Sequence, residues 1–480
     1  MSAADPRDLR ILELEGLLKA ALETIASLTA EVAELKARLG QNSTNSSKPP
    51  SSDPPGTAGK APKVPSGRRP GGQPGHTKNE RALLPVERVN KVVDLVPLRC
   101  GRCQSSLRGK DPEPRRHQVT EVPPIQPHVT EYRCHELTCE ECGEATREAL
   151  PPEGTSHFGP RLNAIAALCG GEYRMSKRTT QQMLSDLLGV DIALGSVSNI
   201  EQEVSESVAT PVEEARACVR EETFVNGDET GWYEGKKAGK RIRAWLWVAG
   251  TPLVTVFLIS LSRGAAVAKQ ILGENFTGFF TSDRWSAYNW LDINLRQLCW
   301  SHLTRDLQGF IDRGGVGGEI GKQLMDLRHQ MFHWWHRVRD GTLQRATFVR
   351  RMEPVEKDFV RLLREAQVRS EPKTSGMARE ILKLESALFT FVTVEGMEPT
   401  NNFAERQVRC AVQWRKTSFG TQSPAGSRFV ERMLTVTATL RQQKRHVLEF
   451  LTRACAAHRL GKPSPSLLPD GGAEMASLAA

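Results

Sequence analysis

The chain has 480 residues, enough for two to four domains, and its 39% hydrophobic content supports folded cores. It contains no run of about 18 apolar residues, which excludes a membrane span, and no N-terminal secretory signal, so we expect a cytoplasmic protein. The formal net charge of +9 is compatible with nucleic-acid binding but does not establish it.

Apolar residues repeat every seven positions in residues 9–39. One set is Ile11, Leu18, Ile25, Val32 and Leu39, and the other is Leu14, Ala21, Leu28 and Leu35. β-Branched residues are common in the first set and leucine in the second, which favours a parallel two-stranded coiled coil. We therefore predict a leucine zipper that mediates self-association. The alternative is a single helix packed on its own domain.

Residues 40–81 form a basic linker. The stretch from Gln41 to Arg81 has seven Lys or Arg residues against two acids, together with many Pro, Ser and Gly residues. Such a composition cannot bury a core. The linker either follows a nucleic-acid backbone or acts as a plain tether.

Residues 82–150 contain two Cys-x-x-Cys pairs. The four thiols belong to Cys100, Cys103, Cys139 and Cys142. Two such pairs can close one tetrahedral Zn²⁺ site, and the metal would supply folding energy that this small module lacks. We predict a zinc ribbon with structural Zn²⁺, in which Cys134 or His135 could replace one ligand.

Residues 157–220 have a helical pattern. Met175–Leu188 and Leu194–Val204 flank a turn at Gly189, a spacing that resembles a helix-turn-helix. A helical hairpin without DNA contacts would have the same pattern, so both interpretations stay open.

The pattern changes to α/β in residues 221–450. We expect strands at 223–228, 241–249, 253–260 and 276–281, a helix at 265–272 and a short strand at 298–300. This is the order of an RNase H-like sheet, in which the first and fourth strands are neighbours. Asp228 and Asp283 end those two strands and should converge. Residues 316–395 read as a helical insertion and 451–480 as a C-terminal tail, so the fold class is multidomain α+β.

A third acid, Glu405, lies early in a helix that follows the insertion. Two Asp and one Glu suit Mg²⁺ or Mn²⁺, and two such ions about 3.5–4 Å apart can clamp a scissile phosphate. The sequence contains no Gly-x₄-Gly-Lys-Ser/Thr loop for ATP. Residues 401–445 carry nine Lys or Arg residues against two acids, which suits contact with phosphates.

Several motifs resemble the DDE transposases of the insertion-sequence 66 family. They are Gly227–Gly231, Thr281–Tyr288, Gln297–Leu303, Thr400–Arg406 and the linker segments 45–53 and 71–76. The resemblance implies a leucine zipper, a zinc-binding domain, a helical segment and a catalytic domain. It also implies DNA cleavage and strand transfer at insertion-sequence ends, that is, DNA transposition and recombination.

The resemblance assigns Asp228, Asp283 and Glu405 as catalytic acids that hold two Mg²⁺ or Mn²⁺ ions. The implied partners are transposon ends, target DNA and accessory proteins of the same element, with a nucleoid-associated location. Five residues are candidate DNA contacts: Arg406, Arg409, Arg415, Lys416 and His302. His302 could instead position a catalytic water or pack in the core.

Other interpretations are open at this stage. Glu229 and Asp292 are the nearest competing acids, although Glu229 should face away from Asp228 along a strand. Arg284 and Trp285 depart from many family members and put the local backbone shape in question. The alternative functions are a non-catalytic zinc-containing DNA-binding repressor, and an RNase H-like nuclease or resolvase that cuts without joining.

Overall fold

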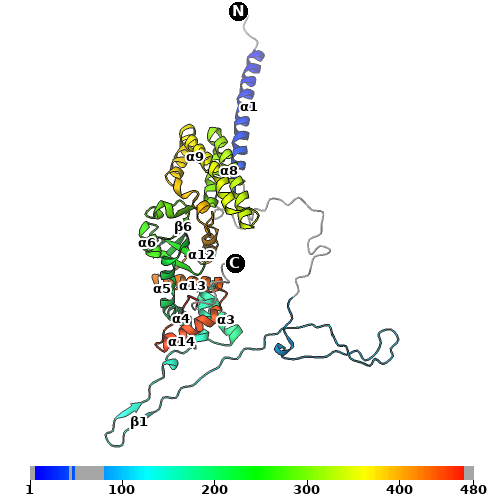
Figure 1. Cartoon of the computed structure of the whole chain (residues 1–480), viewed down its shortest axis with the longest axis vertical. Helices are drawn as coiled ribbons and strands as arrows, with labels where there is room; N and C mark the ends of the chain where they lie inside the picture. The colour runs from blue at the N-terminus through cyan, green and yellow to red at the C-terminus, as the bar shows by residue number, and fades with distance from the viewer. Residues whose placement is uncertain (1–5, 43–45, 49–80, 470–480) are drawn as a thin grey trace, which may run out of the picture. The chain divides into compact units, whose positions relative to one another are not determined.

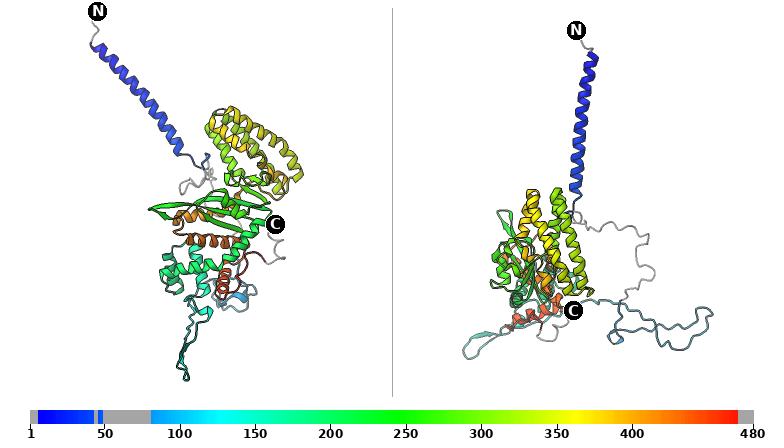
Figure 2. Two further views of the ribbon diagram at one scale, coloured as in Figure 1. Left: turned by 90° about the vertical axis from the view of Figure 1, so that its left-hand side faces the viewer. Right: turned by 45° about the horizontal axis from the view of Figure 1, so that its top comes forward.

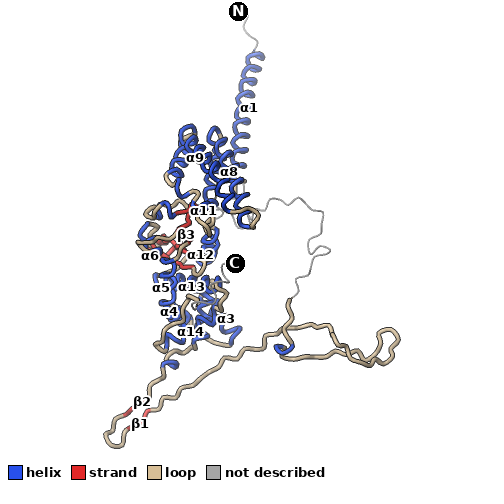
Figure 3. The backbone as a smooth tube through the Cα atoms, viewed as in Figure 1, coloured by secondary structure: helices blue, strands red, loops and turns tan. Residues whose placement is uncertain are grey.

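The computed structural model describes residues 6–42, 46–48 and 81–469 (Figures 1 and 3). The chain divides into two units, residues 58–126 and the remainder. Most of the predicted linker, 40–81, lies outside the described residues. Among the helices in the described part, none has the length and apolar character needed to cross a membrane.

Helix α1 (Pro6–Leu39) is continuous over 34 residues, which confirms the helix that the heptad pattern predicted. Its apolar side chains are exposed in the single chain: Leu18 is 60% exposed, Ile25 59% and Leu28 54%. Among the residues that the structure describes, no other segment covers these leucines. The coiled coil itself stays a prediction.

No residue from 81 to 150 is buried. Residues 81–126 contain a short 3₁₀ turn, η2 (Val86–Arg88), and a turn at residues 101–103 next to an antiparallel bridge between Arg99 and Ser106. In the other unit, β1 (Glu136–Thr138) and β2 (Ala145–Arg147) form an antiparallel hairpin. Without buried apolar side chains, neither segment has a hydrophobic core to hold it folded.

Four α-helices lie in sequence between the β1–β2 hairpin and the main sheet: α2 (Pro160–Gly171), α3 (Lys177–Leu188), α4 (Leu194–Ser207) and α5 (Ala209–Glu221). Helix α3 begins where the Ser176 hydroxyl accepts the Thr179 N–H at 3.1 Å. It ends at Gly189, whose φ of 64° is left-handed. The predicted turn between two helices is therefore present, and DNA reading by α4 stays a prediction.

The main sheet has five strands in the order β5-β4-β3-β6-β7. Their bounds are β3 Phe224–Lys237, β4 Lys240–Gly250, β5 Thr255–Ser260, β6 Phe279–Ser282 and β7 Arg296–Leu298. The first three strands are antiparallel, and β6 and β7 run parallel to β3. Helix α6 (Ala265–Leu272) lies between β5 and β6 in sequence. The first and fourth strands are thus neighbours, as the sequence predicted.

Three helices follow the last strand and the helical lobe: α12 (Asn402–Ser418), α13 (Pro424–Gln442) and α14 (Val447–Arg459). The left view of Figure 2 shows orange-brown helices layered against the green sheet. Leu451 and Cys455 of α14 are buried, and Leu467 is buried beyond it. The folded part therefore continues past residue 450, where the sequence analysis placed a tail, because α14 has an apolar face that packs on α2 and α4.

Helix α13 closes the edge of the sheet. Three outward backbone N–H groups of β5 donate to its side chains: Thr255 to Thr439 Oγ1, Phe257 to Thr435 Oγ1 and Ile259 to Glu431 Oε1, at 3.1, 3.0 and 2.6 Å. The donors are two residues apart along the strand, and the acceptors are four residues apart along the helix. These spacings agree because each corresponds to about 6–7 Å. These donors of the edge strand are therefore satisfied, although no further strand from the described ranges pairs with it.

We expect Thr435→Val to lower the free energy of unfolding by about 1–3 kcal/mol, because the Phe257 N–H would stay buried without an acceptor. The matched control is Thr437→Val, which is equally buried but bonds only to a carbonyl of its own helix. Urea denaturation of the full chain measures both. Equal losses in the two variants would show that the contact to β5 contributes nothing particular.

The helical lobe has its own hydrophobic core. It comprises α7 (Trp300–Arg313), α8 (Gly315–Arg339), α9 (Arg345–Arg369), α10 (Pro372–Leu382) and α11 (Thr390–Thr393). Trp300, Phe359 and Phe389 pack against one another in edge-to-face or tilted contacts at this core. The yellow-green lobe lies beside the sheet in both views of Figure 2. Helices thus occupy the range that the sequence assigned to an insertion.

Candidate active site

Asp228 lies on β3, and Asp283 directly follows the last residue of the neighbouring parallel strand β6. The pairing of β3 with β6 matches residues 55 positions apart, ending with Asn226 opposite Thr281. Asp228 and Asp283 are also 55 positions apart, and each lies two residues beyond this last pair. Because strand residues two apart share a face, the register carries both acids to one side of the sheet.

Glu229 faces the opposite side of the sheet from Asp228. Its buried carboxylate forms an ion pair with Arg263 at 2.7 Å and accepts the Tyr288 hydroxyl at 2.6 Å. On the Asp228 side, the side chains of Asn226 and Thr230 bond to residues of or next to α12. The alternation along β3 therefore separates the two adjacent acids, as expected for a strand.

Buried Asn401 fixes the start of α12 against the sheet. Its side chain accepts from Asn226 Nδ2 at 3.1 Å and donates to the Gly227 carbonyl at 2.7 Å. Its carbonyl accepts the Glu405 N–H at 3.1 Å in the first turn of the helix. The residue before Asp228 and the turn that carries Glu405 are thus joined through one side chain.

The three carboxyl groups influence one another. Burial holds the pKa of Asp228 well above its usual range, and the nearby charges of Glu229, Asp283 and Glu405 raise it further. Burial also raises the pKa of Glu405, to which Asp283 adds while Arg305 opposes. Converging acids that disfavour one another's charge form a site that a cation would stabilise.

The backbone around Asp283 is held by local bonds. The Trp285 N–H donates to Asp283 Oδ1 at 2.8 Å, and Arg263 stacks on the Trp285 ring at 3.8 Å. Arg284 turns away and pairs with Asp306 on α7 at 2.7 Å. The Arg284-Trp285 dipeptide therefore supports the position of Asp283.

Cys299 and His302 lie beside Glu405. Glu405 Oε1 is 3.8 Å from the Cys299 Sγ and 3.3 Å from the His302 Nδ1. Burial raises the pKa of Cys299 to about 11 and lowers that of His302 to about 4. At neutral pH the thiol and the imidazole are therefore both uncharged. Asp292, the other competing acid, is exposed and caps a 3₁₀ turn through the Asn294 N–H.

The predicted DNA contacts on α12 do not all face outward. Arg406, Arg409 and Lys416 are exposed. Arg409 and Lys416 follow Glu405 by four and eleven residues, close to whole turns of a helix, so they share its side. Arg415 instead bonds to Thr230 Oγ1 and the Gly231 carbonyl of β3. Its guanidinium is committed to holding α12 on the sheet.

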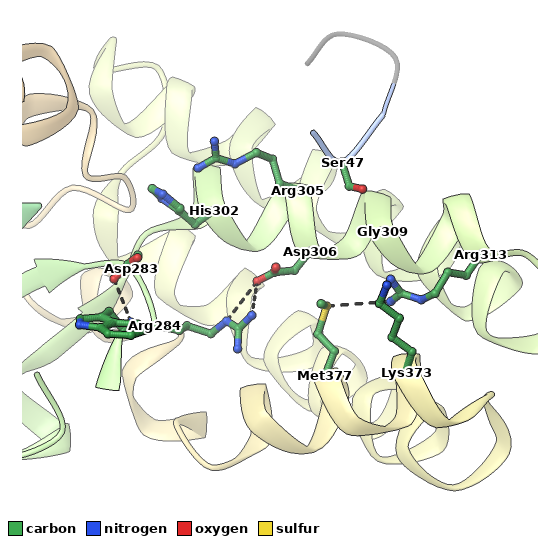
Figure 4. A pocket seen from close by; sticks show the side chains of 11 residues that line it. Ser47, Asp283, Arg284, His302, Arg305, Asp306, Gly309, Arg313, Lys373 and Met377 are labelled. Atoms are coloured by element: carbon green, nitrogen blue, oxygen red, sulfur yellow. Dashed lines mark hydrogen bonds and ion pairs between the residues drawn. The ribbon is translucent and has the colours of Figure 1, made fainter. Parts of the chain in front are cut away.

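A groove of about 480 Å³ leads away from Asp283 along α7. Figure 4 shows Asp283 and His302 at one end and Arg313 and Lys373 at the other, with Arg305 between them. Arg313 pairs with Glu371 at 2.9 Å. Within the part of the chain that the structure describes, Arg305 and Lys373 form no ion pair or hydrogen bond. The groove is therefore positively charged where it leaves the acids.

Each Cys-x-x-Cys pair lies in the same kind of tight turn. The Cys100 N–H donates to Ser105 and its carbonyl accepts from Gln104; Cys139 makes the same bonds with Glu144 and Gly143. Hydrogen bonds with the side chain and backbone of Ser105 lower the pKa of Cys103 to about 7, and backbone hydrogen bonds with Cys142 and Glu141 lower that of Cys139. Both turns favour thiolates, the form that binds metal. That all four sulfurs share one Zn²⁺ stays a prediction.

A protein-family model, described as the transposase IS66 family, matches residues 155–428. The chain belongs to this family. The match covers more than half of the transposase and includes Asp228, Asp283 and Glu405. A second model, a family of unknown function (DUF6444), matches residues 3–82, the range of α1 and the linker. No curated protein matches the transposase significantly.

Sequence reasoning missed several residues of the transposase site. Asn401 stood within a quoted motif, but only the fold shows that it links α12 to β3. Arg305 and Lys373 come from α7 and α10, which meet through packing of the helical lobe. Their sequence signal was weak, because basic residues are frequent on exposed helix faces.

Proposed function

We propose that this transposase cleaves DNA strands at insertion-sequence ends and transfers them to target DNA by a two-metal DDE mechanism. In this proposal, its RNase H-like sheet carries Asp228 and Asp283 and the following helix carries Glu405. The observation that supports it most is the parallel register of β3 and β6, which pairs Asn226 with Thr281, each two residues before one of the aspartates. Burial, together with the charges of Glu229, Asp283 and Glu405, raises the pKa of Asp228, as expected where acids gather.

The donor set fits hard divalent cations. Carboxylate oxygens are preferred ligands of Mg²⁺ and Mn²⁺, and the mutual repulsion of the three acids would be relieved by a cation. When bound, two such ions would lower the pKa of an attacking water or 3′-hydroxyl and stabilise the leaving oxygen. A repressor without catalytic activity would have no need of converging buried acids.

The chain's own residues position the reacting groups. Asn401 holds the turn that carries Glu405, and the Trp285 N–H holds one oxygen of Asp283. Such fixed ligands lower the cost of ordering the site when DNA arrives. The other oxygen of Asp283 accepts no hydrogen bond among the described residues, so it is available to bind a cation.

Cleavage is tested by incubating the full chain with duplex DNA from an element end and Mg²⁺. We expect nicks at the end and, with target DNA present, joined products. Nicks without joined products would favour a resolvase-like nuclease. Cleavage that persists in excess EDTA would contradict the metal-dependent mechanism.

We propose that the groove along α7 receives the DNA backbone, with Arg305 and Lys373 as phosphate contacts. Arg305→Ala should weaken binding to any DNA sequence and reduce the slope of log K against log salt by about one. Arg361→Ala is the control, since Arg361 is an exposed arginine of α9 paired with Asp358. An unchanged slope for Arg305→Ala, measured by fluorescence anisotropy across salt, would place the DNA elsewhere.

We also propose that α1 joins two copies of the chain as a coiled coil. Its heptad leucines form an exposed apolar stripe, which the described part of the chain leaves uncovered. Light scattering should give the mass of a dimer or a larger assembly. A monomeric mass at micromolar concentration would contradict this.

A further inference from the structure

Three residues of different chemistry meet at one corner of the acid site. Cys299 precedes the first residue of α7, His302 lies in the first turn of that helix, and Glu405 comes from α12. One donor atom from each lies within 4.8 Å of the other two. A tetrahedral ion with metal–ligand distances of about 2.0–2.3 Å would need only small side-chain movements here.

The imidazole at this corner has an unsatisfied atom. His302 Nδ1 is buried and makes no hydrogen bond in the part of the chain that the structure describes. It points toward Glu405 Oε1, 3.3 Å away, but without hydrogen-bond geometry. Because a buried polar atom without a partner is costly, its native partner is expected to be something other than a protein side chain.

We propose that Cys299, His302 and Glu405 form a second metal site, which takes one thiophilic divalent cation of the zinc class. Sulfur, imidazole nitrogen and one carboxylate oxygen are the donors that zinc accepts together, whereas Mg²⁺ avoids sulfur. Binding releases the thiol proton of Cys299 to solvent. A water would complete the four ligands on the side where His302 lines the groove.

The two metal sites compete for Glu405. The carboxylate oxygen that faces Cys299 and His302 belongs to the acid that the proposed function gives to the Mg²⁺ pair. A zinc-class ion at the corner therefore draws Glu405 away from Asp228 and Asp283. This part rests on the proposed function and makes the corner an inhibitory site, in which zinc blocks strand cleavage.

Binding is tested by titrating the full chain with Co²⁺ and by counting Zn²⁺ after dialysis. We expect Cys299→Ser and His302→Ala each to bind one ion fewer than the parent. Cys455→Ser is the matched control, since Cys455 is also a buried thiol whose pKa burial raises to about 11. Circular dichroism identifies the folded variants. A folded Cys299→Ser or His302→Ala variant with the parent's ion count would overturn the site.

Sharing of Glu405 is tested separately. Raising Mg²⁺ from about 1 to 10 mM should shift the Zn²⁺ midpoint of the corner site upward by up to about tenfold, the limit for direct competition. Cys299→Ser lacks the corner site and keeps only the zinc ligands of residues 82–150. Its Zn²⁺ midpoint should therefore not shift with Mg²⁺. A Mg²⁺-independent midpoint would overturn the competition. Neither measurement uses DNA, so absence of cleavage activity would count against the proposed function alone.

Discussion

Asp228→Asn, Asp283→Asn and Glu405→Gln are each expected to reduce strand cleavage by at least about a thousandfold, roughly 4 kcal/mol of transition-state stabilisation. Each change removes a charge that would bind metal and keeps nearly the same volume. DNA affinity should stay close to that of the parent, because phosphate contacts come from separate basic residues. A gel assay of end cleavage, with anisotropy for binding, measures both.

Asp292→Asn is the control for this series. Asp292 is an exposed acid nine residues after Asp283, and asparagine can keep its capping bond to the Asn294 N–H. It should therefore cleave like the parent. If the three site variants retained cleavage, or if Asp292→Asn lost as much, the acid assignment would be wrong.

Cys100→Ser is expected to release the structural zinc and unfold residues 82–150. None of these residues is buried, so metal binding would supply most of the free energy that orders them, on the order of 10 kcal/mol. Metal analysis should show one zinc lost, and proteolysis should cut the segment while the sheet stays protected.

Cys218→Ser is the control for the zinc prediction. Cys218 is a half-buried thiol of α5, and burial raises its pKa to about 11, so it has none of the thiolate character of a ligand. It should keep all bound zinc. Full zinc retention in Cys100→Ser would reject that ligand and favour Cys134 or His135 in its place.

The sheet could be predicted from sequence because its strands have local signals. Turn residues bound β4 and β5. The first strand was predicted to end at Asp228, whereas β3 continues through that residue to Lys237, because its antiparallel pairing with β4 extends to Lys240. The order of the predicted elements indicated that β3 pairs with β6, and the structure confirms this pairing. The choice of these acids among 56 Asp and Glu residues came from the family resemblance, since spacing alone could not select them.

The surroundings of the site could not be predicted because they depend on long-range packing. Cys299 lies 106 residues from Glu405 in sequence, and only the docking of α12 on the sheet brings them together. Arg415 was expected to contact DNA, yet it bonds to β3. The angular position around the helix could have predicted this difference. Arg409 and Lys416 lie on the same side of α12 as Glu405, whereas Arg415 does not.

The closure of β5 by α13 has a consequence for how the protein is made. Ile259 is synthesised 172 residues before Glu431, which satisfies its N–H. At about 5–20 residues per second, the nascent sheet would expose this edge for roughly 10–30 s. We infer that the growing chain is most prone to aggregation in this interval. Ribosome-bound chains ending before Pro424 should therefore recruit chaperones more strongly than complete chains, and equal recruitment would contradict this.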